Sequence, residues 1–236
     1  MIKGIIFDYG GTIDTNGMHW GEVIWMMYQK NKITVNKDAF KAAYSFGERS
    51  LAIQKHIFPE HNFLDTLQIK TAIQFDYLKE HGYLPAGDYK NEIKSIAGDC
   101  NAFAQKSVNE AKPVLDELSA KYDLVLVSNF YGNVQSVLTA FGIKNYFKEI
   151  VESAVVGVRK PDPQIFTLGV KALQLPAGDC VVIGDSYTKD IAPANAAGCK
   201  TIWLEGQGWG DDPADTSLAD VTIKSFNEIP LALLKL

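Results

Sequence analysis

The stretch that decides the fold runs from Ile5 to Thr12 and reads IIFDYGGT. Three apolar residues lead into Asp8, and two glycines follow after one further residue. A short apolar run bounded by turn residues predicts a buried strand. Asp8 then lies at the carboxyl end of that strand, where an open α/β sheet has its ligand-binding crevice. This one segment therefore predicts a strand and the first residue of a site.

Five later segments share the features of this first run, being short, apolar and bounded by polar residues. They span residues 123–127, 149–151, 180–183, 201–204 and 220–223. Helical patterns accompany them at residues 108–122, 134–141, 163–173, 188–197 and 226–234. Alternating strands and helices predict an α/β fold with a parallel sheet that helices cover on both faces.

Residues 17–100 interrupt this alternation. They lack convincing strand patterns and carry aromatic and aliphatic residues at helical spacing, as at Trp20, Ile24 and Tyr28. Such stripes are more often helix packing than a ligand-binding box. The predicted division is a core formed by residues 1–16 and 101–236, with an inserted helical domain over residues 17–100.

The composition limits the classes of partner. With 236 residues, 47% of them apolar, the chain can form a large core and a smaller companion. A net charge of -5 without a lysine or arginine run argues against nucleic-acid and anionic-membrane surfaces, which leaves small molecules as partners. No apolar stretch approaches the ~20 residues of a membrane helix, and the first strand begins at once, so we expect a cytoplasmic monomer or homodimer. Three widely spaced cysteines are expected to be buried, without a disulfide or zinc site.

Polar side chains follow the predicted strands in four separated segments: Asp8 to Thr12, Ser128 and Asn129, Arg159 to Asp162, and Asp185 to Asp190. Because the carboxyl ends of parallel strands share one edge, these groups can converge. Gathered carboxylates repel one another unless a cation lies among them, and hard oxygen ligands suit Mg²⁺. Lys160 would neutralise an anion from the opposite side, with hydrogen bonds from Ser128 and Thr12. The set predicts a site for a phosphoryl group.

These four segments resemble, in the same order, the motifs of the haloacid dehalogenase (HAD)-like hydrolase superfamily, which includes phosphotransferases, dehalogenases and phosphonatases. The resemblance covers the whole predicted core, and the insertion falls where that superfamily has its helical C1 cap. It implies a Rossmann-like parallel sheet core with an inserted C1 cap domain.

The resemblance also implies roles for individual residues. Asp8 matches the nucleophile that forms an aspartyl-phosphate, a route available on general chemical grounds. Ser128 and Lys160 match the catalytic, phosphate-binding residues of the second and third motifs. The further phosphate-binding candidates are Thr12, Gly11 and Asn129. Asp162 is expected instead to cap the helix that begins near residue 163.

A magnesium site is the cofactor site that the resemblance implies. Its ligands would be Asp8, Asp185, Asp190 and the backbone carbonyl of Gly10. Asp185 and Asp190 have the Gly-Asp-x-x-x-x-Asp spacing of the acidic last motif.

Gly10 departs from the pattern, because most phosphatases of this family have an aspartate there that protonates the leaving alcohol and later activates water. Such help contributes about 10²–10⁴-fold, whereas phosphoryl transfer depends chiefly on positioning and charge stabilisation. The substrate could leave easily, as an anomeric, acyl or aryl phosphate would; the acid could come from His19, His56 or Glu48; or activity could be vestigial. We favour an easily leaving group in a Mg²⁺-dependent phosphatase for a small phosphorylated metabolite.

Three alternatives stay open on the sequence. Haloacid dehalogenases also lack this aspartate, but they usually have Ser or Asn in the last motif, where this chain has Asp185 and Asp190. Phosphonatases need a cap lysine that forms a Schiff base, with Lys30, Lys32, Lys37, Lys41 and Lys55 as candidates. A binder that has lost catalysis would keep a cluster of like charges that only destabilises the core. Arg49 is a candidate anchor for a second anionic group, beside the simpler interpretation of an exposed helix arginine.

Overall fold

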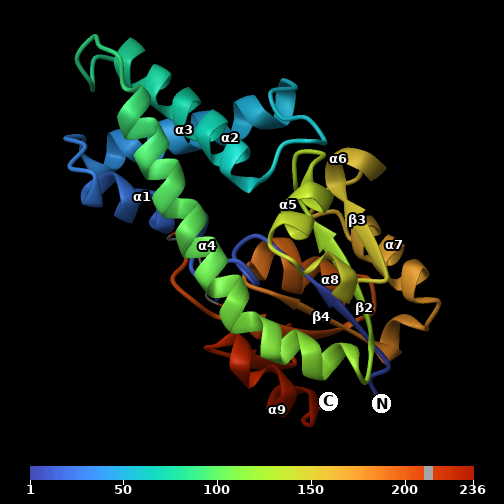
Figure 1. Cartoon of the computed structure of the whole chain (residues 1–236). Helices are drawn as coiled ribbons and strands as arrows, with labels where there is room; N and C mark the ends of the chain where they lie inside the picture. The colour runs from blue at the N-terminus through green and yellow to red at the C-terminus, as the bar shows by residue number, and fades with distance from the viewer. Residues whose placement is uncertain (210–214) are drawn as a thin grey trace.

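The computed structural model of the chain describes residues 1–209 and 215–236, and its centre is a parallel sheet (Figure 1). Six strands lie in the order β3-β2-β1-β4-β5-β6. Their bounds are β1 Gly4–Phe7, β2 Asp123–Ser128, β3 Glu149–Glu152, β4 Cys180–Gly184, β5 Lys200–Leu204 and β6 Val221–Ile223. The α/β prediction and all six predicted strands are confirmed. Because the chain moves outward from β1 first through β2 and β3 and then through β4 to β6, the topological switch lies between β1 and β4.

Side chains of β1 alternate between the two faces of the sheet, as the strand period requires. Ile5 and Phe7 pack in one apolar cluster with residues of α4 (Lys90–Ser119) and α5 (Val134–Ala140). Ile6 packs in the other cluster with residues of α7 (Gln164–Leu173) and α8 (Ala192–Ala196). Both faces of β1 are therefore buried, and Asp8 is the first polar residue after it.

A helical unit stands beyond the sheet in Figure 1. It consists of α1 (Trp20–Lys30), α2 (Lys37–Ile53), α3 (Phe63–Glu80) and the first half of α4. Asn62 begins α3 with a capping box, in which its side chain accepts from the Asp65 backbone at 3.1 Å and Asp65 accepts from its backbone at 3.0 Å. Inside the unit, Tyr28 donates to Gln74 at 3.0 Å among packed aromatic rings. The aromatic stripes of this segment are thus largely packing, as predicted.

Helix α4 connects the two parts, because it runs without interruption from Lys90 to Ser119. The prediction began this helix at residue 108, and the predicted domain boundary at residue 100 lies in its middle. Buried Ile96 and Cys100 face the helical unit, while buried Leu115 and Leu118 continue over the sheet. One apolar cluster continues along the helix from the helical unit to the sheet, so the apolar pattern changes partner halfway and did not mark the true start of the helix.

Two predicted helices near the carboxyl terminus are less regular than expected. Residues 188–197 begin as a π-helical turn, Tyr187–Ile191, before α8, and residues 226–234 begin as a 3₁₀ turn, Phe226–Glu228, before α9 (Ile229–Leu233). A π turn inside a helix is frequent at functional sites, and this one carries Asp190. A short helix α6 (Ser153–Val156) follows β3.

Several smaller features complete the fold. The Asp162 carboxylate accepts from the backbone of Gln164 at 2.9 Å and so caps the start of α7, as predicted. Cys100, Cys180 and Cys199 are buried free thiols, also as predicted. Within residues 1–209 and 215–236, no helix is both long enough and apolar enough to cross a membrane.

Candidate active site

Asp8 lies immediately after β1, and its side chain is enclosed by donors from two other segments and from its own loop. Its backbone donates to Ile183 of β4 at 2.9 Å, which continues the sheet pairing by one residue. Its Oδ1 accepts from Lys160 Nζ at 2.6 Å and, more weakly, from Ser128 Oγ at 3.4 Å. Thr12 Oγ1 lies 3.3 Å from Oδ2. The residue is only 5% exposed, so these contacts hold the carboxylate in one orientation.

Asp185 and Asp190 join Asp8, with carboxylate oxygens of all three within 4.8 Å of one another. Lys160 bridges two of them, since Nζ also donates to Asp190 Oδ1 at 2.6 Å. Thr12 Oγ1 donates to Asp185 Oδ1 at 3.0 Å. The structure therefore brings together residues that the sequence separates by more than 170 positions and that strand ends position as predicted.

The charges in this cluster do not balance. Burial, together with Asp8, raises the pKa of Asp185 well above its ordinary value, and burial also raises the pKa of Asp190 against the effect of Lys160. Burial alone would lower the pKa of Lys160, but Asp190 and Asp8 outweigh it and raise that pKa. Three carboxylates share one ammonium, and a buried carboxylate set of this kind is a donor set for a hard divalent cation such as Mg²⁺. The residues fit the predicted metal.

The two glycines after Tyr9 differ in whether the structure requires a glycine at that position. Gly11 has φ +102, and a Cβ there would lie 2.4 Å from Asp185 Oδ2, so both conformation and space demand glycine. Its backbone donates to Asp14 at 2.7 Å, which commits the N–H expected to bind phosphate. At Gly10, an added Cβ would meet only the Trp20 ring, at 4.0 Å, and the backbone lies outside the left-handed region. Neither sterics nor conformation explains the missing carboxylate at position 10.

Asn129 has a different role from the predicted phosphate contact. Its Nδ2 donates to the Lys160 carbonyl at 3.0 Å, and its Oδ1 accepts from the Lys160 backbone at 2.9 Å. The side chain thus clamps the main chain from which the Lys160 ammonium extends. Asn129 positions Lys160, and Ser186 similarly organises the π turn by accepting from the Lys189 backbone at 3.2 Å.

Asp14 is a buried carboxylate that the sequence analysis missed. It accepts from Gly11 and from Trp20 Nε1, the latter at 2.9 Å, and so joins the loop after β1 to the first helix of the helical unit. Burial raises its pKa to about 8, against the opposing effect of these two hydrogen bonds. The sequence signal was available, since an aspartate directly after apolar Ile13 is an expensive choice without partners.

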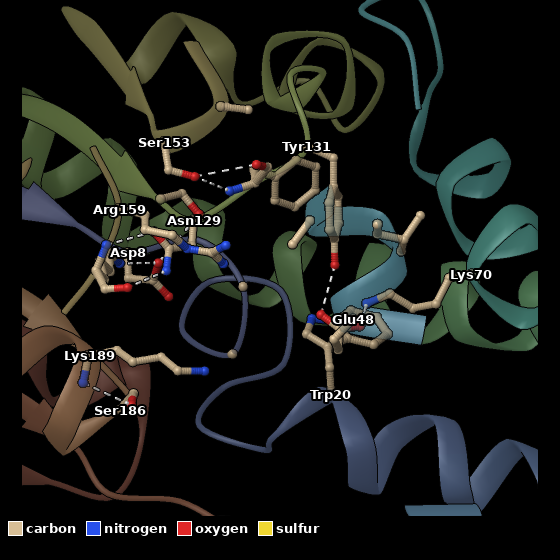
Figure 2. Close-up of a pocket in the computed structure, with 18 of the residues that line it drawn as sticks. Asp8, Trp20, Glu48, Lys70, Asn129, Tyr131, Ser153, Arg159, Ser186 and Lys189 are labelled. Atoms are coloured by element: carbon tan, nitrogen blue, oxygen red, sulfur yellow. Dashed lines mark hydrogen bonds and ion pairs between the residues drawn. The ribbon is translucent and has the colours of Figure 1, made fainter. Parts of the chain in front are cut away.

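A second charged group lies across the cavity from Asp8 (Figure 2). Glu48 of α2 pairs with Lys70 of α3 at 2.6 Å and accepts from Tyr131, in the loop after β2, at 3.0 Å. Burial would raise the pKa of Glu48, but Lys70 outweighs it and lowers that pKa. Conversely, burial would lower the pKa of Lys70, but Glu48 raises it well above its ordinary value. Lys70 and Tyr131 were not predicted, because nothing in a helix pattern or a single loop tyrosine reveals a partner in another element.

The residues predicted as alternative sources of an acidic proton are His19, His56 and Glu48. His19 Nδ1 accepts from the Gly21 backbone at 3.0 Å, so its proton is on Nε2, and the ring stacks on Trp209 at 5.3 Å. Burial, reinforced by the Lys189 charge, lowers its pKa to about 4, so it is neutral at pH 7. Glu48 is ionised by its pairing with a lysine, and His56 is not among the residues that line the cavity. Glu48 and His19 line the cavity, but neither holds an acidic proton suited to this role at neutral pH.

A cavity of about 1130 Å³ separates the two charged groups. Its floor holds Asp8, Lys160 and Asp185, and its far wall holds Glu48 and Lys70. Aromatic side chains from both parts of the molecule line it between these ends: Trp20, Tyr44, Phe63, Phe130, Tyr131 and Trp209. The space is slightly larger than is usual for small-molecule sites.

Sheet order and site together define a doubly wound α/β protein with a carboxylate and lysine centre at its topological switch point. A family model described as haloacid dehalogenase-like hydrolase matches residues 2–198. The chain belongs to this family, as its motifs predicted.

Relatives with assigned activities are similar at modest identity. The glyceraldehyde 3-phosphate phosphatase of Pyrococcus abyssi is 28% identical over 211 residues, which cover 87% of this chain and 82% of that protein. The ribulose-1,5-bisphosphate 5-phosphatase of Halopiger xanaduensis is 33% identical over 130 residues, 52% of this chain and 54% of that protein. Several other matches span less than half the length of the curated relative.

A solved structure shows the same fold over nearly the whole chain. The crystal structure of a dehalogenase superposes with a TM-score of 0.65 at 16% identity, covering 98% of this chain and 96% of that one. At this identity the likeness concerns the fold alone.

Proposed function

We propose that this protein is a Mg²⁺-dependent phosphatase that hydrolyses a small phosphate monoester through an aspartyl-phosphate on Asp8. The observation that carries the proposal is the buried Asp8 carboxylate, 2.6 Å from Lys160 and clustered with Asp185 and Asp190 at the switch point of the sheet. Relatives that are phosphatases support it. The helical unit would act as a C1 cap that covers the site and excludes water.

In this mechanism Asp8 attacks phosphorus, and the bond from phosphorus to the ester oxygen breaks. The departing oxygen leaves as an anion or takes a proton from solvent. Water then attacks the phosphorus of the aspartyl-phosphate, which releases inorganic phosphate and restores the Asp8 carboxylate. Lys160 and the hydroxyls of Ser128 and Thr12 would stabilise the negative charge on the transferred group.

Mg²⁺ would be held by Asp8, Asp185, Asp190 and the Gly10 carbonyl, and it would supply positive charge at the phosphate oxygens. With no carboxylate at residue 10, an ionised Glu48 and a neutral His19, the described residues that line the cavity outside the Asp8 cluster include no acid for a poor leaving group. We therefore propose a substrate whose leaving oxygen is weakly basic, as in acyl, anomeric or aryl phosphates.

The test is turnover of p-nitrophenyl phosphate and a panel of metabolite phosphates, with and without Mg²⁺, by the wild type and Asp8→Asn. Asp123→Asn is the matched control, because Asp123 begins β2 at the opposite edge of the sheet, where it pairs with Lys148 on the surface. Activity should require both Mg²⁺ and Asp8 and should survive the control substitution. Turnover that persists in Asp8→Asn would overturn the proposal.

The alternatives have distinct signatures in the same preparation. Chloride release from 2-chloropropionate without Mg²⁺ would indicate a dehalogenase. A borohydride-trapped adduct with phosphonoacetaldehyde would indicate a phosphonatase, although the raised pKa of Lys70 keeps that cavity amine protonated. Tight Mg²⁺-dependent phosphate binding without turnover of any compound would indicate a binding protein.

A further inference from the structure

The chain contains only two arginines, Arg49 and Arg159, and both line the cavity. They approach it from opposite sides, Arg49 from α2 of the helical unit and Arg159 from the core loop that carries Lys160. Lys55 and Lys189 line it as well. Among the described residues, no carboxylate oxygen lies within 4.0 Å of any of these four cationic side chains. Lysines elsewhere on the surface, by contrast, commonly form ion pairs.

The charge of the cavity is opposite to that of the molecule. The chain carries a net charge of -5. Away from the Asp8 cluster, however, Glu48 is the acidic residue of the cavity lining, and Lys70 neutralises it at 2.6 Å. Positive charge without a neutralising partner in the lining therefore remains on the two arginines, Lys55 and Lys189. A concave site lined by one sign of charge concentrates ligands of the opposite sign.

We propose that the substrate carries a second anionic group, a phosphate or a carboxylate, which Arg49 and Arg159 bind from the two sides of the cavity with Lys55 and Lys189 beside them. The inference rests on the proposed function and narrows its substrate class. The transferred phosphate already has Lys160 and the hydroxyls of its own cluster, so the outer cations serve a different charge. Arginine fits this task because its planar fork matches the oxygens of a carboxylate or phosphate in pairs.

The placement of these side chains agrees with this role. Figure 2 shows Arg159 and Lys189 extending from core loops toward the side of the cavity where Glu48 and Trp20 lie. Both residues directly precede site residues in sequence, Lys160 and Asp190, and are therefore held next to the reaction centre. The cavity of about 1130 Å³ has room for a molecule much larger than one phosphate.

Three aryl esters test the inference, because phenyl phosphate, 4-carboxyphenyl phosphate and hydroquinone bisphosphate share one class of leaving group. We expect kcat/KM for at least one of the two doubly anionic esters to exceed that for phenyl phosphate by about tenfold, which is about 1.4 kcal/mol. The better of the two identifies the second group as carboxylate or phosphate. The preference should shrink as ionic strength rises, because partly exposed charges are screened.

Charge-neutral variants assign the preference to residues. Arg49→Gln and Arg159→Gln should each reduce the ratio of kcat/KM between the doubly and singly anionic esters several-fold, and Lys171→Gln should leave the ratio unchanged. Lys171 is the control because it is exposed on α7 and does not line the cavity. Equal kcat/KM values for all three esters in the wild type, or a preference that survives both arginine substitutions, would overturn the inference.

Calorimetric binding to Asp8→Asn separates this inference from the proposed function. Tighter binding of hydroquinone bisphosphate than of phenyl phosphate, dependent on the arginines, would support the second-anion site even if no ester is hydrolysed. Hydrolysis of phenyl phosphate without any such preference in binding or turnover would support the phosphatase and reject the second-anion site.

Discussion

The two walls of one cavity are built in opposite ways. On the core wall, Asp8, Lys160 and Asp190 are each at most 5% exposed, and the Lys160 ammonium donates to both carboxylates at 2.6 Å. On the wall of the helical unit, Glu48 pairs with Lys70 at 2.6 Å but keeps 34% of its side-chain surface exposed, and aromatic rings and the exposed Arg49 and Lys55 line the same wall. The rigid wall suits positioning of a reacting phosphate, and the open wall suits recognition of the rest of the molecule. Substitutions on the two walls should therefore have separable effects.

The largest effect is expected on the core wall, for Lys160→Met. Removing the ammonium leaves Asp8 and Asp190 as buried carboxylates without their shared partner, which typically costs about 3–5 kcal/mol of unfolding free energy. Loss of a positive group that faces the transferred phosphate should lower kcat by about 10²–10³-fold. Urea unfolding and p-nitrophenyl phosphate turnover measure the two quantities.

Lys148→Met is the matched control for this prediction. Lys148 pairs with Asp123 at 2.8 Å, but both side chains are about half exposed, and such surface pairs contribute at most about 1 kcal/mol. If the two methionine variants were equally stable and equally active, the core wall would not depend on its buried charges, and the contrast between the walls would fail.

The next effect concerns the carboxylate that is missing at position 10 of the core wall. Gly10→Asp places a carboxylic acid where an added Cβ has only the Trp20 ring nearby, at 4.0 Å. General acid–base help at that position should raise turnover of alkyl phosphates by about 10²-fold and change aryl phosphate turnover much less. The measurement is the slope of log kcat/KM against leaving-group pKa, which should be steep in the wild type and shallow in the variant.

Gly10→Asn separates proton transfer from shape in this experiment. Asparagine fills the same space but cannot donate an acidic proton, so its leaving-group slope should remain that of the wild type. A wild-type slope already as shallow as that of Gly10→Asp would mean that another residue supplies the proton, and our interpretation of the missing carboxylate would be wrong.

The same contrast between the walls explains what the sequence could reveal. Buried strands leave continuous apolar runs, and the residue that ends each run lies at a fixed place on the sheet, so Asp8, Ser128 and Asp185 could be grouped without a structure. Lys160 and Asp190 lie farther along the chain, after α6 and within the π turn, and the resemblance to the family motifs added them to the group. The six strands were predicted for the same reason. A single sequence shows where each buried strand ends, and in a parallel sheet the strand ends lie along one edge.

The wall of the helical unit offers no such constraint. Lys70 lies in a helix whose buried and polar residues are mixed, and its partner Glu48 belongs to another helix, so the pairing depends on how α2 and α3 pack. Tyr131 reaches Glu48 from a core loop, and Trp209 stacks on His19 from the loop after β5. These contacts join segments far apart in sequence, and no spacing rule marks them.

A smaller effect is expected on the open wall, for Lys70→Met. The Glu48 carboxylate would lose its ion pair but keep the Tyr131 hydrogen bond and some water, so the unfolding free energy should fall by about 1–3 kcal/mol. The double variant Glu48→Gln with Lys70→Met should recover part of this loss, because the unpaired charge is then gone. Turnover of p-nitrophenyl phosphate should fall far less than in Lys160→Met. A loss of kcat as large as that of Lys160→Met would show that the open wall takes part in the chemistry.

The effect expected to change turnover least is a pH dependence of stability at Asp14, whose carboxylate links the loop after β1 to Trp20 of α1. Burial raises its pKa from 3.8 to about 8, so between these values the folded protein keeps a proton that the unfolded chain has lost. The unfolding free energy should therefore fall as pH rises from about 4 to about 8, by at most about 1.4 kcal/mol per unit. Asp14→Asn has no carboxyl proton at this position. Its unfolding free energy relative to that of the wild type should therefore rise as pH increases across that range.

Urea unfolding at several pH values measures this drift. Asparagine also turns one N–H toward Gly11 or Trp20, each of which already donates to Asp14, so a constant penalty of about 1–2 kcal/mol should accompany the drift. Only the pH-dependent part reports the buried proton, because the lost hydrogen bond weakens the variant equally at every pH. Parallel stability curves for Asp14→Asn and the wild type would mean that Asp14 is ionised throughout, held by its two donors, and that the link between the loop after β1 and α1 is a fixed anion.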